Sequence, residues 1–207
     1  MRLTIFGGTG RVGRRLLEYA ARDGHTIRAL VRDPAKLPAG LGGQAVTGDV
    51  TDAGAVLRAL EGAEVVLSAL GGAGLENPGT ILSSGMRNIV AGMKRQGIRR
   101  VLAVAGSGVL DDPRGGLRSE APGFPAIYAA ITREHLGTYD ALRESGLEWT
   151  LVCCPDLVDG ELTRRYRLAA DLLPEGASSI SVEDVAGFML QQMPLAPYIR
   201  RRVGIGY

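Results

Sequence analysis

A glycine-rich turn that directly follows an apolar run constrains this chain more than any other feature. Residues 3–6 read Leu-Thr-Ile-Phe, and Gly7, Gly10 and Gly13 follow at regular spacing. The pattern predicts a strand, a tight turn and the start of a helix in direct succession. Small residues there let backbone N–H groups approach a pyrophosphate, and the helix N-terminus adds about half a positive charge. The segment is therefore predicted to bind a dinucleotide.

The chain beyond this turn alternates short apolar runs with helical patterns, which is typical of βαβ units and a parallel sheet. We expect strands at 3–6, 27–31, 44–47, 65–68, 100–104 and 149–152, and helices near 79–96, 126–144 and 182–192. The predicted fold class is α/β, a Rossmann-type doubly wound parallel sheet. With 207 residues the chain fits one NAD(P)-binding domain, 1–207, with a small substrate-side region at 153–207.

Composition narrows the possible partners. A formal net charge of +2 and 5% aromatic residues give no sign of a nucleic-acid surface. No run approaches the ~20 apolar residues of a membrane span, so no membrane partner and a cytoplasmic location are expected. Cys153 and Cys154 are adjacent and are expected to be reduced, buried strand residues, and no metal-ligand spacing is present. The basic run 200–202 is predicted to be a solvated tail.

The end of the second predicted strand favours NADPH, with NADH bound more weakly. An acid at this place usually accepts the ribose 2′-hydroxyl of NAD, whereas an arginine meets the 2′-phosphate of NADP. Here Arg32 comes first, Lys36 follows within reach, and Arg11 opens the first helix. Asp33 is one residue late and is expected to point away or to pair locally. Three cations are thus predicted around a 2′-phosphate.

The sequence resembles the atypical short-chain dehydrogenases/reductases, and among these most closely the biliverdin reductase B (flavin reductase) group. The resemblance runs nearly full length and is carried by IFGGTGRVG at 5–13, LVRD at 30–33, GDV at 48–50, ALGG at 69–72, RNIVAGMK at 87–94, LRESGL at 142–147 and FML at 188–190. It implies direct hydride transfer from NADPH to a small-molecule redox acceptor: a flavin, a linear tetrapyrrole or a quinone. Flavin would be a substrate and not a bound cofactor, and the protein a monomer or homodimer.

The motif and this resemblance together assign the cofactor-binding positions. Adenine-side contacts would come from near Asp49 and Val50, and the strand end at 105–107 would lie beside the nicotinamide. The expected cofactor residues are Gly7, Thr9, Gly10, Arg11, Val12, Gly13, Arg32, Lys36, Asp49, Val50, Leu70, Gly71, Gly72, Arg87, Ala105 and Gly106.

Catalytic candidates follow from what the chain lacks as well as from what it has. The Tyr-x-x-x-Lys pair of ordinary short-chain dehydrogenases is missing, because Thr132 stands where the lysine after Tyr128 would be. Hydride transfer to a flavin or quinone needs little acid assistance. Ser107 stands one place after the usual serine or threonine pair of the family, and His135 stands where the flavin reductase also has a histidine. The catalytic candidates are thus Ser107, Tyr128 and His135.

The substrate pocket is expected to include Pro155 and Asp156, the latter at the position of a histidine in the flavin reductase. The Pro- and Gly-rich segment 110–125 is expected to be a long functional loop. Two alternatives stay open. One is an NmrA-like regulatory protein that senses NADP(H) without turnover, which the missing lysine favours. The other is a sugar-nucleotide epimerase or reductase, which the short C-terminal region disfavours.

Overall fold

The computed structural model describes residues 1–38, 40, 44–72 and 74–207. Its centre is an eight-stranded sheet of order β3-β2-β1-β4-β5-β6-β10-β8. The strands are β1 (Arg2–Phe6), β2 (Thr26–Val31), β3 (Gln44–Thr47), β4 (Val65–Ser68), β5 (Arg100–Gly106), β6 (Glu148–Cys154), β8 (Arg167–Ala170) and β10 (Arg201–Gly206). All neighbouring pairs are parallel except β10 and β8. This is the doubly wound Rossmann arrangement that the sequence predicts.

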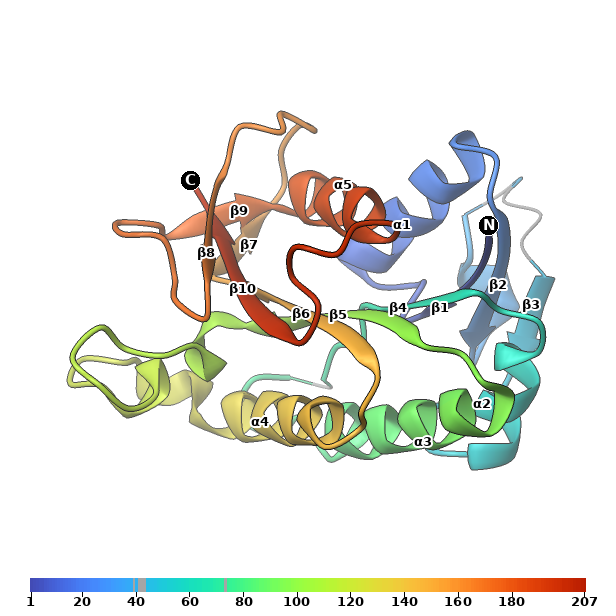
Figure 1. Cartoon of the computed structure of the whole chain (residues 1–207), viewed down its shortest axis with the longest axis horizontal. Coiled ribbons are helices and arrows are strands. Elements are labelled where there is room, and N and C mark those ends of the chain that lie inside the picture. The colour runs from blue at the N-terminus through green and yellow to red at the C-terminus, as the bar shows by residue number, and fades with distance from the viewer. Residues whose placement is uncertain (39, 41–43, 73) are drawn as a thin grey trace.

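Helices cover both faces of the sheet (Figure 1). The five are α1 (Arg11–Arg22), α2 (Ala53–Leu60), α3 (Ile81–Gln96), α4 (Ala129–Arg143) and α5 (Val182–Gln192). In the view of Figure 1, α1 and α5 lie above the sheet, and α2, α3 and α4 lie below it. Burial on both faces explains why the strands read as nearly continuous apolar runs. From β1, the strands β2 and β3 are added to one side of the sheet, and β4, β5 and β6 to the other. The strand order therefore reverses between β1 and β4, and ligands of open α/β sheets bind at such a switch point.

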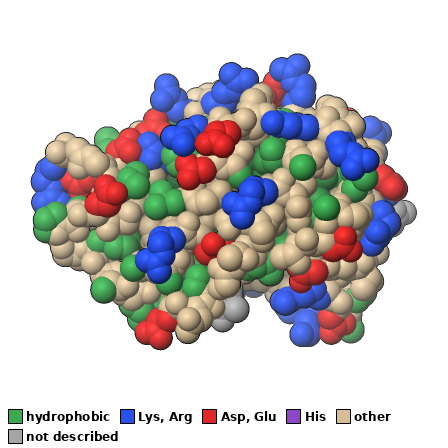
Figure 2. All heavy atoms as spheres, turned by 90° about the horizontal axis from the view of Figure 1, so that it is seen from below, with side chains coloured by type: hydrophobic (Ala, Val, Ile, Leu, Met, Phe, Trp, Pro, Cys, Tyr) green, Lys and Arg blue, Asp and Glu red, His purple; other side chains and the backbone are tan. Residues whose placement is uncertain are grey.

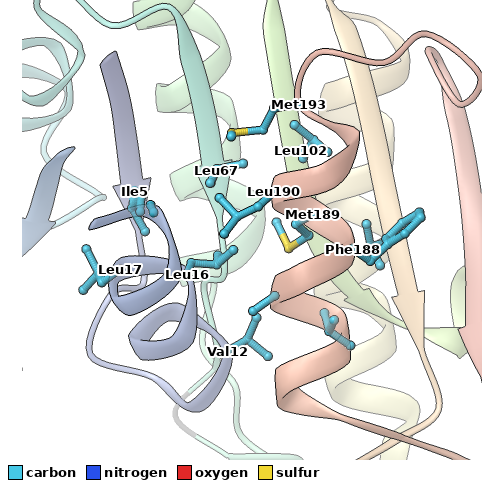
Figure 3. Close-up of a cluster of buried hydrophobic side chains, with 14 of the residues drawn as sticks. Ile5, Val12, Leu16, Leu17, Leu67, Leu102, Phe188, Met189, Leu190 and Met193 are labelled. Atoms are coloured by element: carbon cyan, nitrogen blue, oxygen red, sulfur yellow. The ribbon is translucent and has the colours of Figure 1, made fainter. Parts of the chain in front are cut away.

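One apolar core fills the space between α1, α5 and the sheet (Figure 3). Val12 and Leu16 of α1 face Met189 and Leu190 of α5, with Leu67 of β4 behind them. A second core fills the space between the sheet and α2, α3 and α4, and it includes the only tryptophan of the sequence, Trp149. On the outer side of these three helices, acidic and basic side chains are interspersed (Figure 2). Within the described residues, no helix is long and apolar enough to cross a bilayer.

The last strands correct one prediction. The basic run is not a solvated tail, because Arg201 and Arg202 begin β10 and the Arg202 residue is only 6% exposed. The Arg202 guanidinium is held by Asp111 (2.7 Å), by Asp171 (3.3 Å) and by the carbonyl of Val109 (2.7 Å). A buried cation is tolerated when such partners are present, and none of them is visible in the local sequence pattern.

The structure also contains a second, smaller sheet. It pairs β7 (Asp156–Val158) with β9 (Ser179–Ser181). Ser181 also caps α5 by accepting a hydrogen bond from the Asp184 backbone N–H at 3.0 Å, as its place before the acidic first turn predicts. A 3₁₀ helix at Ser107–Val109 precedes the predicted loop 110–125, and another, Arg118–Glu120, lies within it. The 3₁₀ helix Ala126–Tyr128 leads into α4, and Pro34–Lys36 follows β2.

Candidate active site

A cleft of about 240 Å³ opens at the carboxyl ends of β1, β2 and β4. Nine of the predicted cofactor residues line it: Gly7, Thr9, Gly10, Arg32, Asp49, Val50, Leu70, Gly71 and Gly72. Phe6, Leu30, Val31, Gly48, Ala69 and Ile81 complete the lining. The residues come from five separate segments of the chain, and the switch point of the sheet brings them together.

The glycine turn is shaped for close backbone approach. Gly7 has a φ of 77°, and a Cβ atom there would collide with the carbonyl of Ala69 at the end of β4. A Cβ on Gly13 would collide with the carbonyl oxygen of Gly7, so α1 can pack against the turn only without a side chain. No side chain caps the first turn of α1, and no acid lies in it. The backbone N–H groups at the start of α1 are therefore free to bind an anion such as the pyrophosphate of a dinucleotide.

Arg32 brings positive charge to the rim of this cleft. The pKa of Asp49 is lowered, mainly by hydrogen bonds from the backbone N–H and hydroxyl of Thr51 and also by the charge of Arg32. Asp33 turns to its own chain, where its carboxylate accepts the Ala35 N–H at 3.0 Å. The carboxylate is thus engaged locally, as the sequence suggests, and Arg32 is the charged side chain of this strand end that lines the cleft.

The other expected cofactor residues lie off the cleft lining. Arg11 reaches across to β7, where it donates to the Leu157 carbonyl at 3.0 Å. It also pairs with Asp159, the residue after that strand, at 2.7 Å. Val12 and Gly13 are buried in α1, and Ala105 is buried in β5. Lys36 ends the 3₁₀ helix after β2, Arg87 is exposed on α3, and Gly106 lines a different cavity. Arg11 therefore links the start of α1 to β7 and the residue that follows it.

A larger pocket of about 520 Å³ lies beyond the carboxyl ends of β5 and β6. All five predicted catalytic and substrate residues line it: Ser107, Tyr128, His135, Pro155 and Asp156. The two cavities adjoin, because a Cβ on Gly72 of the cleft would come within 2.9 Å of Ile131, which lines the pocket. The lining of the cleft and the lining of the pocket are therefore in contact at these two residues.

His135 stands at the inner end of this pocket beside the end of β5. A Cβ placed on Gly106 would lie 3.4 Å from Cδ2 of its ring. Burial lowers the pKa of His135 to about 4, against a smaller opposing effect of Glu134. Its buried Nδ1 has no hydrogen-bond partner among the described residues. At neutral pH this imidazole is therefore uncharged, and its Nδ1 makes no hydrogen bond within the described structure.

Tyr128 and Asp156 meet across the pocket. The Tyr128 hydroxyl donates to Oδ1 of Asp156 at 3.2 Å, which joins the start of α4 to the start of β7. The carboxylate charge is the main cause that raises the pKa of Tyr128, with the hydrogen bond second. This tyrosine therefore stays protonated at neutral pH, and without a nearby lysine it lacks the activation found in ordinary short-chain dehydrogenases.

Sequence reasoning missed most of the wall formed by the loop after β5. The missed lining residues are Leu75, Gly108, Asp112, Arg114, Arg118, Ala121, Pro122, Gly123, Phe124, Pro125, Ile131, Thr132, Cys154, Ala177 and Ser178. The only signal was the unusual length of the loop, which indicated function without naming side chains. In the described part of the chain, no group of three or more His, Cys, Asp or Glu residues could hold a metal ion.

Comparison with known proteins agrees with the binding of a dinucleotide. Residues 7–194 match the model of a family described as NAD(P)H-binding. One stretch of 80 residues is 38% identical to the isoflavone reductase homolog IRL of Zea mays. That stretch covers 34% of this chain and 26% of the maize protein. The chain thus matches only about a quarter of the length of that relative.

Solved structures match the whole chain. An exported protein of provisional assignment from Burkholderia pseudomallei is 30% identical, with 100% of both chains covered and a TM-score of 0.85. A provisionally assigned NADH-flavin reductase from Streptococcus pneumoniae TIGR4 is 25% identical, with 100% and 99% covered and a TM-score of 0.85. ChuY, an anaerobillin reductase from Escherichia coli O157:H7, is 22% identical, with 99% and 96% covered and a TM-score of 0.80. The last of these shows the shared fold alone.

Proposed function

Since the chain belongs to the family of NAD(P)H-binding proteins, we propose that it is an NADPH-dependent reductase that passes hydride to a flavin or a similar flat redox acceptor. The observation that carries this proposal is that a cleft suited to a dinucleotide and a larger pocket lie side by side, with their linings in contact at Gly72 and Ile131. The bound dinucleotide would supply the hydride. The neighbour described as an NADH-flavin reductase supports the flavin class of acceptor.

The cleft residues would bind and orient the dinucleotide. The backbone of the Gly7–Gly13 turn would hold the pyrophosphate, and Arg32 would pair with a 2′-phosphate through its planar guanidinium. Because the Asp33 carboxylate is bound to Ala35, it offers no competing contact to a ribose hydroxyl. This arrangement supports NADPH over NADH.

The pocket residues would orient the acceptor and exclude water from one side of it. The neutral His135 ring, which lines the pocket, would make a hydrogen bond to a polar atom of the acceptor, and the Ser107 hydroxyl, at the start of the turn after β5, would make another. Tyr128 would fix the pocket wall through Asp156 and would not act as a general acid. Protons for the reduced acceptor would come from solvent, because an electron-poor acceptor needs orientation more than acid catalysis.

The direct test is the loss of nicotinamide absorbance when purified protein is mixed with NADPH and an acceptor. FMN, riboflavin and a simple quinone are supplied in turn, and NADH is run beside NADPH. We expect oxidation with at least one acceptor and a higher kcat/KM for NADPH than for NADH. Tight NADPH binding, seen by fluorescence, without oxidation by any acceptor would overturn the reductase and would indicate a sensor of NADP(H).

A further inference from the structure

An arginine on the wall of the larger pocket has no partner among the charged side chains around it. Arg118 lies in the 3₁₀ helix 118–120 and lines the pocket. Its backbone N–H donates to the Leu110 carbonyl at 2.8 Å, which fixes this part of the loop against the end of β5. The side chain is half-buried, and its Nε is buried without a hydrogen-bond partner in the ranges that the structure describes. The Arg118 guanidinium therefore has no counter-ion among the described residues.

The other charges of the pocket are already paired. Arg114 holds Asp112 through two contacts, Nε to Oδ1 at 2.8 Å and one terminal nitrogen to Oδ2 at 3.1 Å. These bonds, with a smaller contribution from the charge of Arg118, lower the pKa of Asp112 to about 2. Asp156 accepts the Tyr128 hydroxyl, and His135 is neutral. Of the charged side chains that line the pocket, Arg118 is the one without an ion-pair or hydrogen-bond partner among the described residues.

A buried donor without a partner is costly, by about 1–3 kcal/mol, and a ligand that satisfies it recovers that cost. A guanidinium presents parallel N–H donors that match the oxygens of a phosphate or a carboxylate. Apolar side chains of the same pocket, Phe124 and Ile131, offer surface for a flat ring system. The pocket volume of about 520 Å³ lies within the usual range of small-molecule sites, about 300–1,000 Å³.

We propose that the acceptor of this reductase carries an acidic group, a phosphate or a carboxylate, and that Arg118 binds that group. This rests on the proposed function, which places a flat redox acceptor in the same pocket. The ring of the acceptor would lie toward His135 and the boundary with the cleft, and its acid would lie toward the loop. Arg118 thereby selects among acceptors that share one redox-active ring.

The test uses pairs of acceptors that differ only in the acid. FMN and riboflavin share the isoalloxazine ring and differ by a phosphate, whereas biliverdin and its dimethyl ester differ by two free carboxylates. Binding of each flavin is measured by quenching of its fluorescence with NADP⁺ present, and turnover of all four by NADPH oxidation. We expect at least tenfold tighter binding of FMN than of riboflavin, or at least a tenfold lower KM for biliverdin than for its ester. The pair that responds identifies the acid.

The variant Arg118→Met should remove this discrimination. We expect KM for the acidic acceptor to rise about tenfold or more with little change in kcat, while the uncharged member of the pair changes by less than about twofold. Arg118→Lys should restore part of the preference. Arg95→Met is the charge-matched control. Arg95 is exposed in the last turn of α3, near the amino end of β5, whereas the pocket lies at the carboxyl end of that strand.

Two failures can be told apart. Equal binding of both members of each pair, or an equal loss for both in Arg118→Met, would overturn the acid site even if NADPH oxidation proceeds. Conversely, Arg118-dependent binding of FMN without oxidation of NADPH by any acceptor would overturn the reductase and leave the acid site standing. Circular dichroism and NADPH affinity of Arg118→Met, both expected to be unchanged, show whether that variant is folded.

Discussion

At the scale of single residues, the neighbours Arg32 and Asp33 show how one position in a strand end changes the role of a side chain. Arg32 lines the dinucleotide cleft, while the next carboxylate caps a 3₁₀ helix. The order of the two residues indicates this division, because a local Asx-type hydrogen bond needs only the following backbone. The contact of Arg32 with a 2′-phosphate stays a prediction.

Arg32→Ala should weaken NADPH much more than NADH. A charge-assisted pair with a phosphate is worth about 1.5–3 kcal/mol, so KM for NADPH should rise about 10- to 100-fold, and KM for NADH should change by less than about twofold. Steady-state kinetics with both cofactors measure this. Arg22→Ala, which removes an exposed cation at the end of α1, is the matched control. A similar loss for both cofactors would show that Arg32 does not bind the 2′-phosphate.

His135 should make the fold sensitive to mild acid. Its pKa in the folded protein is about 4, below the ordinary value, so only the unfolded chain takes up this proton as the pH falls through about 6.5. Stability is therefore full above that pH and declines toward pH 4. The free energy of unfolding should fall by about 2 kcal/mol from pH 7.5 to pH 5 through this group. Urea denaturation at both pH values measures the change.

Two variants separate this effect from other titrations. His135→Gln should lose most of that pH dependence, whereas His25→Gln, at the turn before β2, should keep it. An unchanged pH dependence in His135→Gln would mean that the histidine is not the group responsible.

At the scale of elements, a buried arginine joins the sheet to a helix end. Arg100, the first residue of β5, donates to the carbonyls of Gln192 and Met193 at the end of α5, at 2.9 and 3.3 Å. It also donates to the Thr150 hydroxyl at 2.8 Å. A positive charge suits the C-terminus of a helix, whose last carbonyls have no partner within the helix. Burial lowers the pKa of Arg100 to about 10, so the group still remains charged at neutral pH.

Arg100→Ala should lower the free energy of unfolding by about 2–4 kcal/mol, because buried carbonyls lose their donor and a cavity remains. Arg99→Ala is the matched control. Its side chain is exposed and pairs with Glu148 at the surface, so the loss should stay below about 1 kcal/mol. Guanidinium denaturation of the two variants measures the loss of stability. Equal losses in the free energy of unfolding would contradict the view that Arg100 stabilises the end of α5.

Elements differ in how well the sequence predicts them. The strands β3 and β4 and the helix α5 have the expected bounds, and β1, β2, β5 and β6 extend one or two residues beyond them. Their signal is local, since apolar β-branched runs and a serine cap need no distant partner. β10 was predicted wrongly because Arg202 is stabilised by Asp111 and Asp171, which lie far away in the sequence. The loop residues that line the pocket were also missed, because they meet the rest of the lining only through contacts between residues distant in the sequence.

At the scale of the whole molecule, two cores on opposite faces share one sheet. Phe188 belongs to the core of α1 and α5, whereas Trp149 belongs to the core of α3 and α4. Because the central strands β1, β4, β5 and β6 are packed on both sides, neither core should remain ordered without the other.

Phe188→Ala should therefore lower stability by about 3–5 kcal/mol and should shift both faces together. Trp149 fluorescence reports one face, far-ultraviolet circular dichroism reports all helices, and the two denaturation curves should coincide in wild type and variant. Separate midpoints would show that the faces unfold independently.

The two cavities draw on different stretches of the chain. The cleft is built from residues between Phe6 and Ile81, and the pocket, apart from Leu75, from residues between Gly106 and Ser178. Substitutions that reshape the pocket can therefore leave the cleft intact. Because many of the pocket's lining residues lie within 107–128, exchange of this segment between relatives should change which acceptor binds and should leave dinucleotide binding unchanged.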